Sequence, residues 1–322
     1  MTGPAKPLRV GMCGSAYWAE TVHLPALKNA TGLELAGLFG RNQDRISELA
    51  HRFRIRPYER FEDLLDAVDI VSFAVPPAVQ AKLALQAAQA GKHIIVEKPL
   101  ALGVDEAEAI EAAVTSADLG AVCFLTRDFI SDLQDFTAQA VAASPRTARA
   151  IFFSSVLSNG SPYAESEWRK DRNATLWDIG PHLLSSLMSI FGPADSVSAR
   201  RTDTGGIAGI LYHSSGKTSD FEANQRVPFG RQELLTVETA QGQKELNLLQ
   251  YDRVAAFGRA LNRLARAIAG DNAARKAFGK AVDVVRVLSA AERSLEACGT
   301  PQEIQAGMPE RKSLIVVPGG AS

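Results

Sequence analysis

The first 125 residues alternate short apolar runs with helical stretches, and this alternation constrains the fold more than any other feature. The apolar runs lie at 8–13, 33–39, 68–75, 93–96 and 120–125. Helical patterns lie between them at 19–29, 43–53, 79–90 and 104–116. Apolar strands joined by helices of about 10–15 residues form parallel sheets covered on both faces. We therefore expect an α/β fold with a doubly wound, Rossmann-type sheet that binds ligands beyond the carboxyl ends of its strands.

The pattern changes after about Arg127. Helices are expected at 131–143, 177–191, 253–269 and 274–297, and strands at 149–157, 196–202, 206–212, 218–226, 234–239, 245–249 and 314–317. Several strands in succession without intervening helices favour an antiparallel sheet. The sequence thus predicts a Rossmann domain at 1–126 and an α+β domain with an open, mostly antiparallel sheet at 127–322.

Composition and charge exclude several kinds of partner. The chain is 46% hydrophobic and 22% charged, with a net charge of −1 and no basic block, so nucleic-acid binding is not expected. Its apolar stretches are too short to span a membrane, and its start lacks a signal-peptide core. The three cysteines are widely spaced, which suits neither disulfides nor a metal site. We expect a cytoplasmic protein.

A candidate phosphate loop follows the first strand, at Gly14, Ser15, Ala16, Tyr17 and Trp18. Free backbone N–H groups at a helix N-terminus favour a pyrophosphate. Only the tight-turn glycine of the dinucleotide fingerprint is present, because alanine occupies the position where the backbone should approach the pyrophosphate. The segment by itself fits either a dinucleotide site or an ordinary strand-to-helix turn.

The end of the second strand bears on cofactor choice. NAD-preferring domains usually place a carboxylate there to hold the ribose 2′-OH, but this chain has Arg41 and Asn42. A guanidinium can pair with a 2′-phosphate. The residues favour NADP(H) over NAD(H), although Arg41 in a solvated loop is the simpler alternative.

Two further segments carry candidate acid–base groups. Glu97 and Lys98 directly follow the strand at 93–96, which puts the lysine at the ligand-binding edge, although most lysines are only surface residues. Asp178 and His182 are four residues apart in an expected helix, so both project from one face. From the residues alone, His182 fits a core or helix-cap histidine better than a catalytic one.

Together these segments resemble the glucose–fructose oxidoreductase / inositol dehydrogenase / rhizopine-catabolism (Gfo/Idh/MocA) family of NAD(P)-dependent oxidoreductases. The resemblance extends over more than half of the chain. The matching residues are the Gly14 turn, Ala74-Val75-Pro76-Pro77, Ala90-Gly91-Lys92-His93, Glu97-Lys98-Pro99, Arg127 with Phe129, Trp168-Arg169 and Asp178-Ile179-Gly180-Pro181-His182.

The resemblance implies roles for these residues. Lys98 and His182 would be the acid–base residues, with Asp178 orienting the substrate or the imidazole. Arg127, Trp168 and Arg169 would shape the substrate pocket, while Val75, Pro76, Glu97 and Lys98 would lie at the cofactor.

The resemblance also implies a substrate class and an oligomeric state, and it leaves two alternatives open. The substrate would be a polyhydroxylated small molecule such as a sugar or cyclitol, and the protein a homodimer or homotetramer. Two alternatives are transient cofactor use in elimination or epimerisation, and a non-catalytic ligand-binding or regulatory homologue. The family often has histidine where this chain has Gln80, a departure expected to alter the pocket wall.

Overall fold

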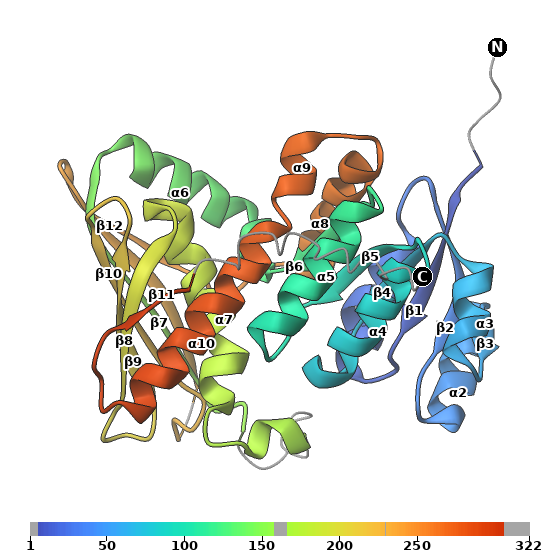
Figure 1. Cartoon of the computed structure of the whole chain (residues 1–322), viewed down its shortest axis with the longest axis horizontal. Coiled ribbons are helices and arrows are strands. Elements are labelled where there is room, and N and C mark those ends of the chain that lie inside the picture. Colours follow the sequence, from blue (N-terminus) through green and yellow to red (C-terminus); the bar gives the residue numbers. More distant parts are fainter. Residues whose placement is uncertain (1–5, 158–165, 229, 306–322) are drawn as a thin grey trace, which may run out of the picture.

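The computed structural model describes residues 6–157, 166–228 and 230–305. Two sheets lie side by side along the long axis of the molecule, with α7 (Ala174–Phe191) and α10 (Gly279–Glu296) beside the second sheet (Figure 1). The expected strand at 314–317 lies outside the described residues. No helix in the described part of the chain is long and apolar enough to cross a membrane.

The first sheet is parallel and doubly wound, as the sequence predicted. Its strands are β1 (Leu8–Cys13), β2 (Leu33–Phe39), β3 (Arg56–Tyr58), β4 (Ile70–Phe73), β5 (His93–Glu97) and β6 (Ala121–Phe124). They lie in the order β3-β2-β1-β4-β5-β6. The order reverses between β1 and β4, so the switch point at which such sheets bind ligands lies beyond the ends of these two strands.

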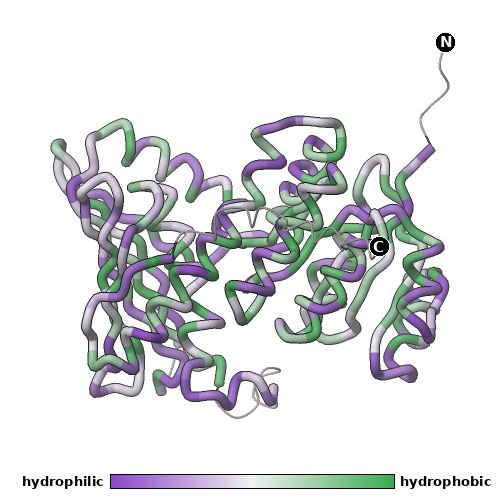
Figure 2. Tube along the Cα trace, viewed as in Figure 1, coloured by the Kyte–Doolittle hydropathy of each residue, from purple (hydrophilic) through white to green (hydrophobic). Residues whose placement is uncertain are grey.

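Helices cover both faces of this sheet. One layer is α3 (Phe61–Ala67), α4 (Pro77–Gln89) and α5 (Val104–Ser116). The other is α1 (Leu24–Lys28), α2 (Gln43–Phe53) and α8 (Arg253–Ile268). In Figure 2, hydrophobic residues concentrate on the central strands and hydrophilic ones on outer helices and loops.

Helix α8 shows that a late part of the chain completes the first sheet. Its Phe257 is fully buried and makes an edge contact with Phe124 of β6, at 4.9 Å between ring centroids. Without α8, the apolar face of β5 and β6 would be left uncovered. The following helix, α9 (Asn272–Lys276), and α10 replace the single helix expected at 274–297.

The first helix also differs from its expected form. It begins with a π-helical turn, η1 (Ala19–His23), in which the Leu24 N–H bonds to the Ala19 carbonyl, and continues as α1. Pro25 lacks the N–H that a regular helix would require at that position, so the chain makes the wider turn before it.

The second sheet is mixed, with one parallel pair among antiparallel ones. Its strands are β7 (Pro145–Ser154), β8 (Ala194–Arg201), β9 (Ile207–His213), β10 (Thr218–Asn224), β11 (Arg231–Thr239), β12 (Gly242–Asn247) and β13 (Gln302–Glu303). They lie in the order β12-β11-β7-β10-β9-β8-β13, and β7 and β10 are parallel. The expected open, mostly antiparallel sheet is confirmed.

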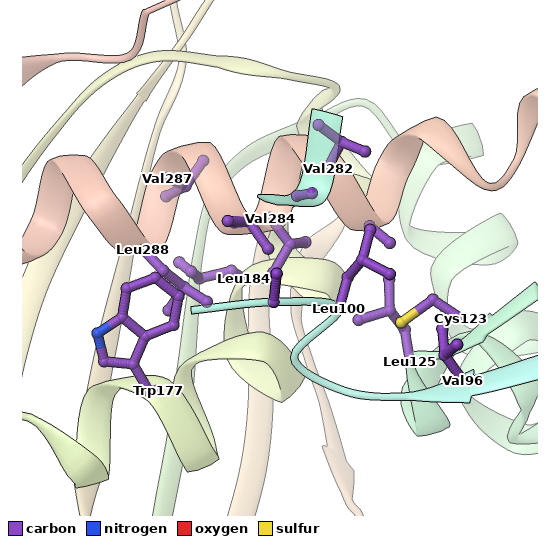
Figure 3. Packing of buried hydrophobic residues seen from close by; sticks show 14 of the residues in the cluster. Val96, Leu100, Cys123, Leu125, Trp177, Leu184, Val282, Val284, Val287 and Leu288 are labelled. Carbon is purple, nitrogen blue, oxygen red and sulfur yellow. The ribbon is translucent and has the colours of Figure 1, made fainter. Parts of the chain in front are cut away.

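A continuous apolar core joins the two parts. Figure 3 shows Leu184 of α7 and Val284 of α10 close to Leu100, which follows β5. The chain enters the second part through η2 (Thr126–Phe129) and α6 (Ser131–Ala142). This shared core fixes the carboxyl end of β5 against α7.

Candidate active site

Gly14 closes the first strand at the switch point, where its conformation admits only glycine. Its φ is +124°, and a Cβ there would lie 2.3 Å from the Ala74 carbonyl oxygen. Its N–H donates to the Phe39 carbonyl at 2.8 Å. The glycine therefore lets the loop after β1 pass close to the loop after β4, which contains the half-buried Val75 and the exposed Pro76.

The rest of the predicted phosphate loop faces outward. Ser15 is half-buried, whereas Ala16 and Tyr17 are exposed at the carboxyl edge of the sheet. The first turn of a helix leaves N–H groups without intrahelical partners, and here Ser15 to Trp18 lead from Gly14 into that turn. These features fit a dinucleotide pyrophosphate.

Arg41 and Asn42 follow β2 at the same edge. Arg41 is exposed. The Asn42 side chain caps α2, because its Oδ1 accepts a hydrogen bond from the Arg45 N–H at 3.0 Å. Both residues are exposed, and Asn42 is the one whose side chain is used as a helix cap.

Glu97 ends β5 within a buried polar network. Its Oε1 accepts from Trp18 Nε1 at 2.6 Å and lies 3.0 Å from His23 Nε2. The other ring nitrogen of His23 lies 2.9 Å from the Ser72 hydroxyl. The network ties the first helix, β4 and β5 together directly below Lys98.

Gln80 holds the turn that carries Lys98. It is 1% exposed, and its Nε2 donates to the carbonyls of Glu97, Pro99 and Leu100 at 2.7, 3.0 and 3.3 Å. Its Oε1 accepts from the Glu97 N–H at 2.8 Å. The expectation that Gln80 alters the pocket wall needs correction, because these bonds place it beneath the turn.

Lys98 reaches across to the second part of the chain. Its Nζ donates to Asp178 Oδ1 at 2.8 Å and to the Asp178 carbonyl at 2.9 Å. Arg169, from η3 (Glu167–Lys170), donates to both carboxylate oxygens of Asp178, at 2.8 and 3.1 Å. Gln225, which follows β10, donates from Nε2 to Oδ2 at 2.7 Å. Asp178 is thus a buried carboxylate between two cations and an amide.

The charge state of Asp178 follows from this environment. Burial alone would raise the pKa of the carboxyl group. The Lys98 ammonium and the Arg169 guanidinium outweigh burial and hold that pKa well below its usual range. Asp178 is therefore an anion at neutral pH.

His182 lies one helical turn after Asp178 and stacks on Phe152 of β7, at 5.9 Å between ring centroids. Its Nδ1 is enclosed and has no hydrogen-bond partner. Burial lowers the pKa of the imidazole well below its usual range, and the charges of Arg127, Lys98 and Arg231 lower it further. The ring is accordingly neutral at neutral pH.

Arg127 belongs to a second buried ion pair beside His182. It is 2% exposed, pairs with Glu233 and donates to the Tyr251 hydroxyl at 3.0 Å. Its guanidinium also lies over the Phe152 ring, 5.5 Å from the centroid. Trp168 packs against Arg169, whose guanidinium carbon lies 4.4 Å from the centroid of the Trp168 ring.

The structure brings five of the predicted residues into one region: Lys98, Arg127, Arg169, Asp178 and His182. Arg41 and Asn42 lie apart from them, after β2. Sequence reasoning missed Gln225, Glu233 and Tyr251, which stand in no local motif. Glu233 in β11 and Gln225 directly after β10 are polar side chains at positions that strand alternation turns inward. Tyr251 lies in the connection between β12 and α8 and carries no such signal.

Comparison with known proteins supports an oxidoreductase with an NAD-binding Rossmann fold. Residues 8–123 match the family model described as "Oxidoreductase family, NAD-binding Rossmann fold". The oxidoreductase YdgJ of Escherichia coli is 26% identical over 190 residues, which are 58% of this chain and 54% of YdgJ. A D-xylose 1-dehydrogenase (NADP(+)) of Haloferax volcanii is 28% identical over 257 residues, 74% of this chain and 75% of that protein.

The fold of the whole chain also matches a solved structure. GenD2 from gentamicin A biosynthesis, in complex with NAD, superposes with a TM-score of 0.83 at 20% identity, covering 95% of this chain and 98% of GenD2. The chain spans about half the length of YdgJ. Residues 8–123 thus match the family model of the Gfo/Idh/MocA oxidoreductases, and the fold of the whole chain is that of GenD2.

Proposed function

We propose that this protein is an NAD(P)-dependent oxidoreductase that acts on a CH–OH group of a sugar, cyclitol or related polyol. The observation that carries the proposal is the contact of Lys98 with Asp178 at the carboxyl end of β5. It places a proton-carrying side chain and a buried carboxylate on the edge of the sheet where such domains bind ligands. The sugar dehydrogenase among the relatives supports the substrate class.

The cofactor would lie across the switch point. Gly14, Ser15, Ala16, Tyr17 and Trp18 would hold its pyrophosphate, and Val75 and Pro76 would line its path toward Glu97. When bound, the nicotinamide accepts or supplies the hydride. We propose a preference for NADP(H), since Arg41 is exposed after β2 and suits a 2′-phosphate.

Lys98 is the proposed acid–base residue. An ammonium group has three N–H bonds, and the two contacts to Asp178 use two of them. The third remains for the substrate oxygen, so Lys98 would give a proton to that oxygen in reduction and take it back in oxidation.

His182 is the proposed second contact to the substrate oxygen. A neutral imidazole carries one proton. The enclosed Nδ1 finds no partner, so the accessible Nε2 is the better position for that proton. We propose that Nε2–H donates to the oxygen on which negative charge develops. Arg127 and Arg169 would shape the pocket around it, with Trp168 supporting Arg169.

We further propose that the outer face of the second sheet forms the interface of a homodimer or homotetramer. The half-buried residues Ile151, Phe153, Ile210, Tyr212 and Leu234 share that face. Light scattering coupled to gel filtration tests this, and a monomer at micromolar concentration would contradict it.

A substrate screen tests the proposed activity. The protein would be incubated with D-xylose, D-glucose, myo-inositol or nucleotide sugars and with NADP⁺ or NAD⁺, and nicotinamide absorbance followed. We expect turnover of at least one polyol, faster with NADP⁺. It should be lost in Lys98→Met and retained in Lys82→Met, a matched change at an exposed position of α4.

The same screen separates the alternatives. Tight cofactor retention without net reduction would favour transient use of the cofactor in elimination or epimerisation. Polyol binding without any chemistry would favour a ligand-binding homologue.

A further inference from the structure

Gln225 is a buried amide that the proposed chemistry leaves unexplained. It directly follows β10 and is 0% exposed. Its Nε2 donates to Asp178 Oδ2 at 2.7 Å, while its Oε1 is enclosed and receives no hydrogen bond. An ionised carboxylate can only accept, so the NH₂ end of the amide must face Asp178. The unpartnered Oε1 is a direct consequence of serving that carboxylate.

This arrangement lowers stability, because a buried acceptor without a donor keeps its desolvation penalty. Asp178 already has two cationic partners, Lys98 and Arg169, so neutralising its charge does not require the amide. Native proteins leave few buried polar atoms unpaired, and the exceptions call for an explanation.

Within residues 6–157, 166–228 and 230–305, the other buried side-chain polar atoms without a partner lie in the same part of the molecule. They are Ser154 Oγ, His182 Nδ1 and Arg231 Nε. Ser154 pairs in register with Arg231, and β10 runs beside β7 up to the pair Asn224–Phe153, one residue before Gln225. Unsatisfied polar atoms thus gather where the second sheet meets α7, as in a region arranged for function at some cost in stability.

The Gln225 amide fixes the orientation of the Asp178 carboxylate. Lys98 contacts Oδ1, and Arg169 contacts both oxygens of the carboxylate. Gln225 contacts Oδ2 from the sheet side. A donor from this third side fixes the rotation of the carboxylate about its Cβ–Cγ bond without adding charge. Lys98, held by that carboxylate, is fixed with it.

We propose that Gln225 is a positioning residue: its amide locks the Asp178 carboxylate in the orientation that presents Lys98 Nζ to the substrate oxygen. This inference rests on the proposed oxidoreductase function. It assigns no direct contact with the substrate to Gln225, which acts through Asp178.

The first test replaces the amide by an apolar side chain of similar size. Gln225→Met should lower kcat about 100-fold on the best substrate of the screen, because catalysis is this sensitive to displacement of about 1 Å. The Kd for NADPH, measured by fluorescence, should stay within about twofold, and Tm should not fall, because the unpaired acceptor is removed with the donor. Gln232→Met, an exposed position on the other face of β11, is the matched control.

The second test restores the donor through pH. Gln225→Glu places two carboxyl groups side by side, and such a pair shares a proton at low pH. The protonated pair again contains an O–H donor. Lys98 and Arg169 at Asp178 oppose protonation of the pair, whereas burial favours it. Arg127 and Arg231 lie farther out, around His182, whose imidazole is neutral. Recovery is therefore expected toward the acid end of a range from about pH 8 to about pH 5. The ratio of kcat for Gln225→Glu to that of wild type should rise along that range.

The outcomes are distinct. Full kcat in Gln225→Met overturns the positioning role and leaves the proposed function intact. A variant that fails to fold, or loses Tm in step with kcat, identifies a structural residue and also overturns the role. A wild-type protein that turns over no polyol overturns both proposals. Loss of kcat with Tm preserved, and acid recovery in Gln225→Glu, support the role.

Discussion

Replacing Asp178 by asparagine tests the electrostatic core of the site. The change keeps the shape of the side chain but removes the negative charge between Lys98 and Arg169. Four N–H donors from three side chains, two on each oxygen, converge on the carboxylate in the wild-type protein. Asparagine offers one oxygen and an NH₂ group, so at least one of those donors then faces another donor.

The magnitude follows from how little water reaches the group. The side chains of Lys98 and Arg169 are only 13% and 16% exposed, and that of Asp178 is 6% exposed. Removing one partner of a buried ion pair costs about 3–5 kcal/mol. With about 2–4 °C of Tm per kcal/mol for domains of this size, Asp178→Asn should lower Tm by roughly 10 °C at neutral pH.

The effect should depend on pH in a defined direction. The pKa of Asp178 is held below its usual range by Lys98 and Arg169 despite burial. Its contribution to stability is therefore fully present above the unfolded-state pKa, near 4, and is lost as pH falls below it. The Tm difference between wild type and Asp178→Asn should shrink in acid.

Thermal unfolding followed by circular dichroism between about pH 3 and about pH 8 measures this difference. Asp203→Asn, at an exposed position, is the control for a change of charge alone. The reasoning is refuted if Asp178→Asn melts within about 1 °C of wild type at neutral pH, or if the Tm gap is the same at both ends of the range.

Three further predictions concern the cofactor and the proton. Lys98→Met should abolish turnover while the Kd for NADPH stays within about twofold, because Lys98 contacts Asp178 and not the phosphate loop; a large loss of NADPH affinity would contradict the separation. Arg41→Ala should weaken NADPH binding about tenfold and leave NADH binding nearly unchanged; equal effects in fluorescence titrations would remove Arg41 from 2′-phosphate recognition. Ala16→Gly should leave cofactor affinity equal or higher, since the exposed methyl lies where the backbone should approach the pyrophosphate; a clear loss would mean that the loop requires the methyl.

Local signals were enough to predict much of the first sheet. The bounds of β1, β2, α2 and α5 agree with the sequence expectation, because apolar runs and caps mark their ends. The short β3 and α3 were missed, since three- and seven-residue elements give too little periodicity to detect. The packing of α8 on the first sheet could not be foreseen, because its amphipathic pattern shows that a face is buried but not against which partner.

The candidate site also contains some residues that the sequence could predict and others that it could not. Lys98, Asp178 and His182 stand in recognisable segments, and the structure places them together. Glu233 lies in β11 and Gln225 directly follows β10, strands in which every second residue turns inward. The contact of Gln225 with Asp178 and that of Glu233 with Arg127 therefore depend on the strand order β11-β7-β10. That order is set by long-range pairing, which residue spacing does not reveal.

The last prediction concerns Gln80, which the sequence analysis placed at the pocket wall and the structure places beneath the Lys98 turn. Its amide bonds to one backbone N–H and to three carbonyls around Lys98. Gln80→Leu would leave several buried backbone groups unpaired, at about 1–3 kcal/mol each. We expect a total loss of roughly 3–5 kcal/mol, within the range for a broken buried hydrogen-bond network. The Lys98 turn should loosen and kcat should fall with it.

Unfolding in urea would measure the loss of stability in Gln80→Leu. Gln89→Leu, at an exposed position on the same helix, is the control. Gln80→His should be intermediate, because a neutral imidazole supplies one donor and one acceptor to the same backbone groups. If Gln80→Leu were as stable as wild type and altered only substrate preference, Gln80 would after all be a residue of the pocket wall, and the turn at Lys98 would be held by the sheet alone.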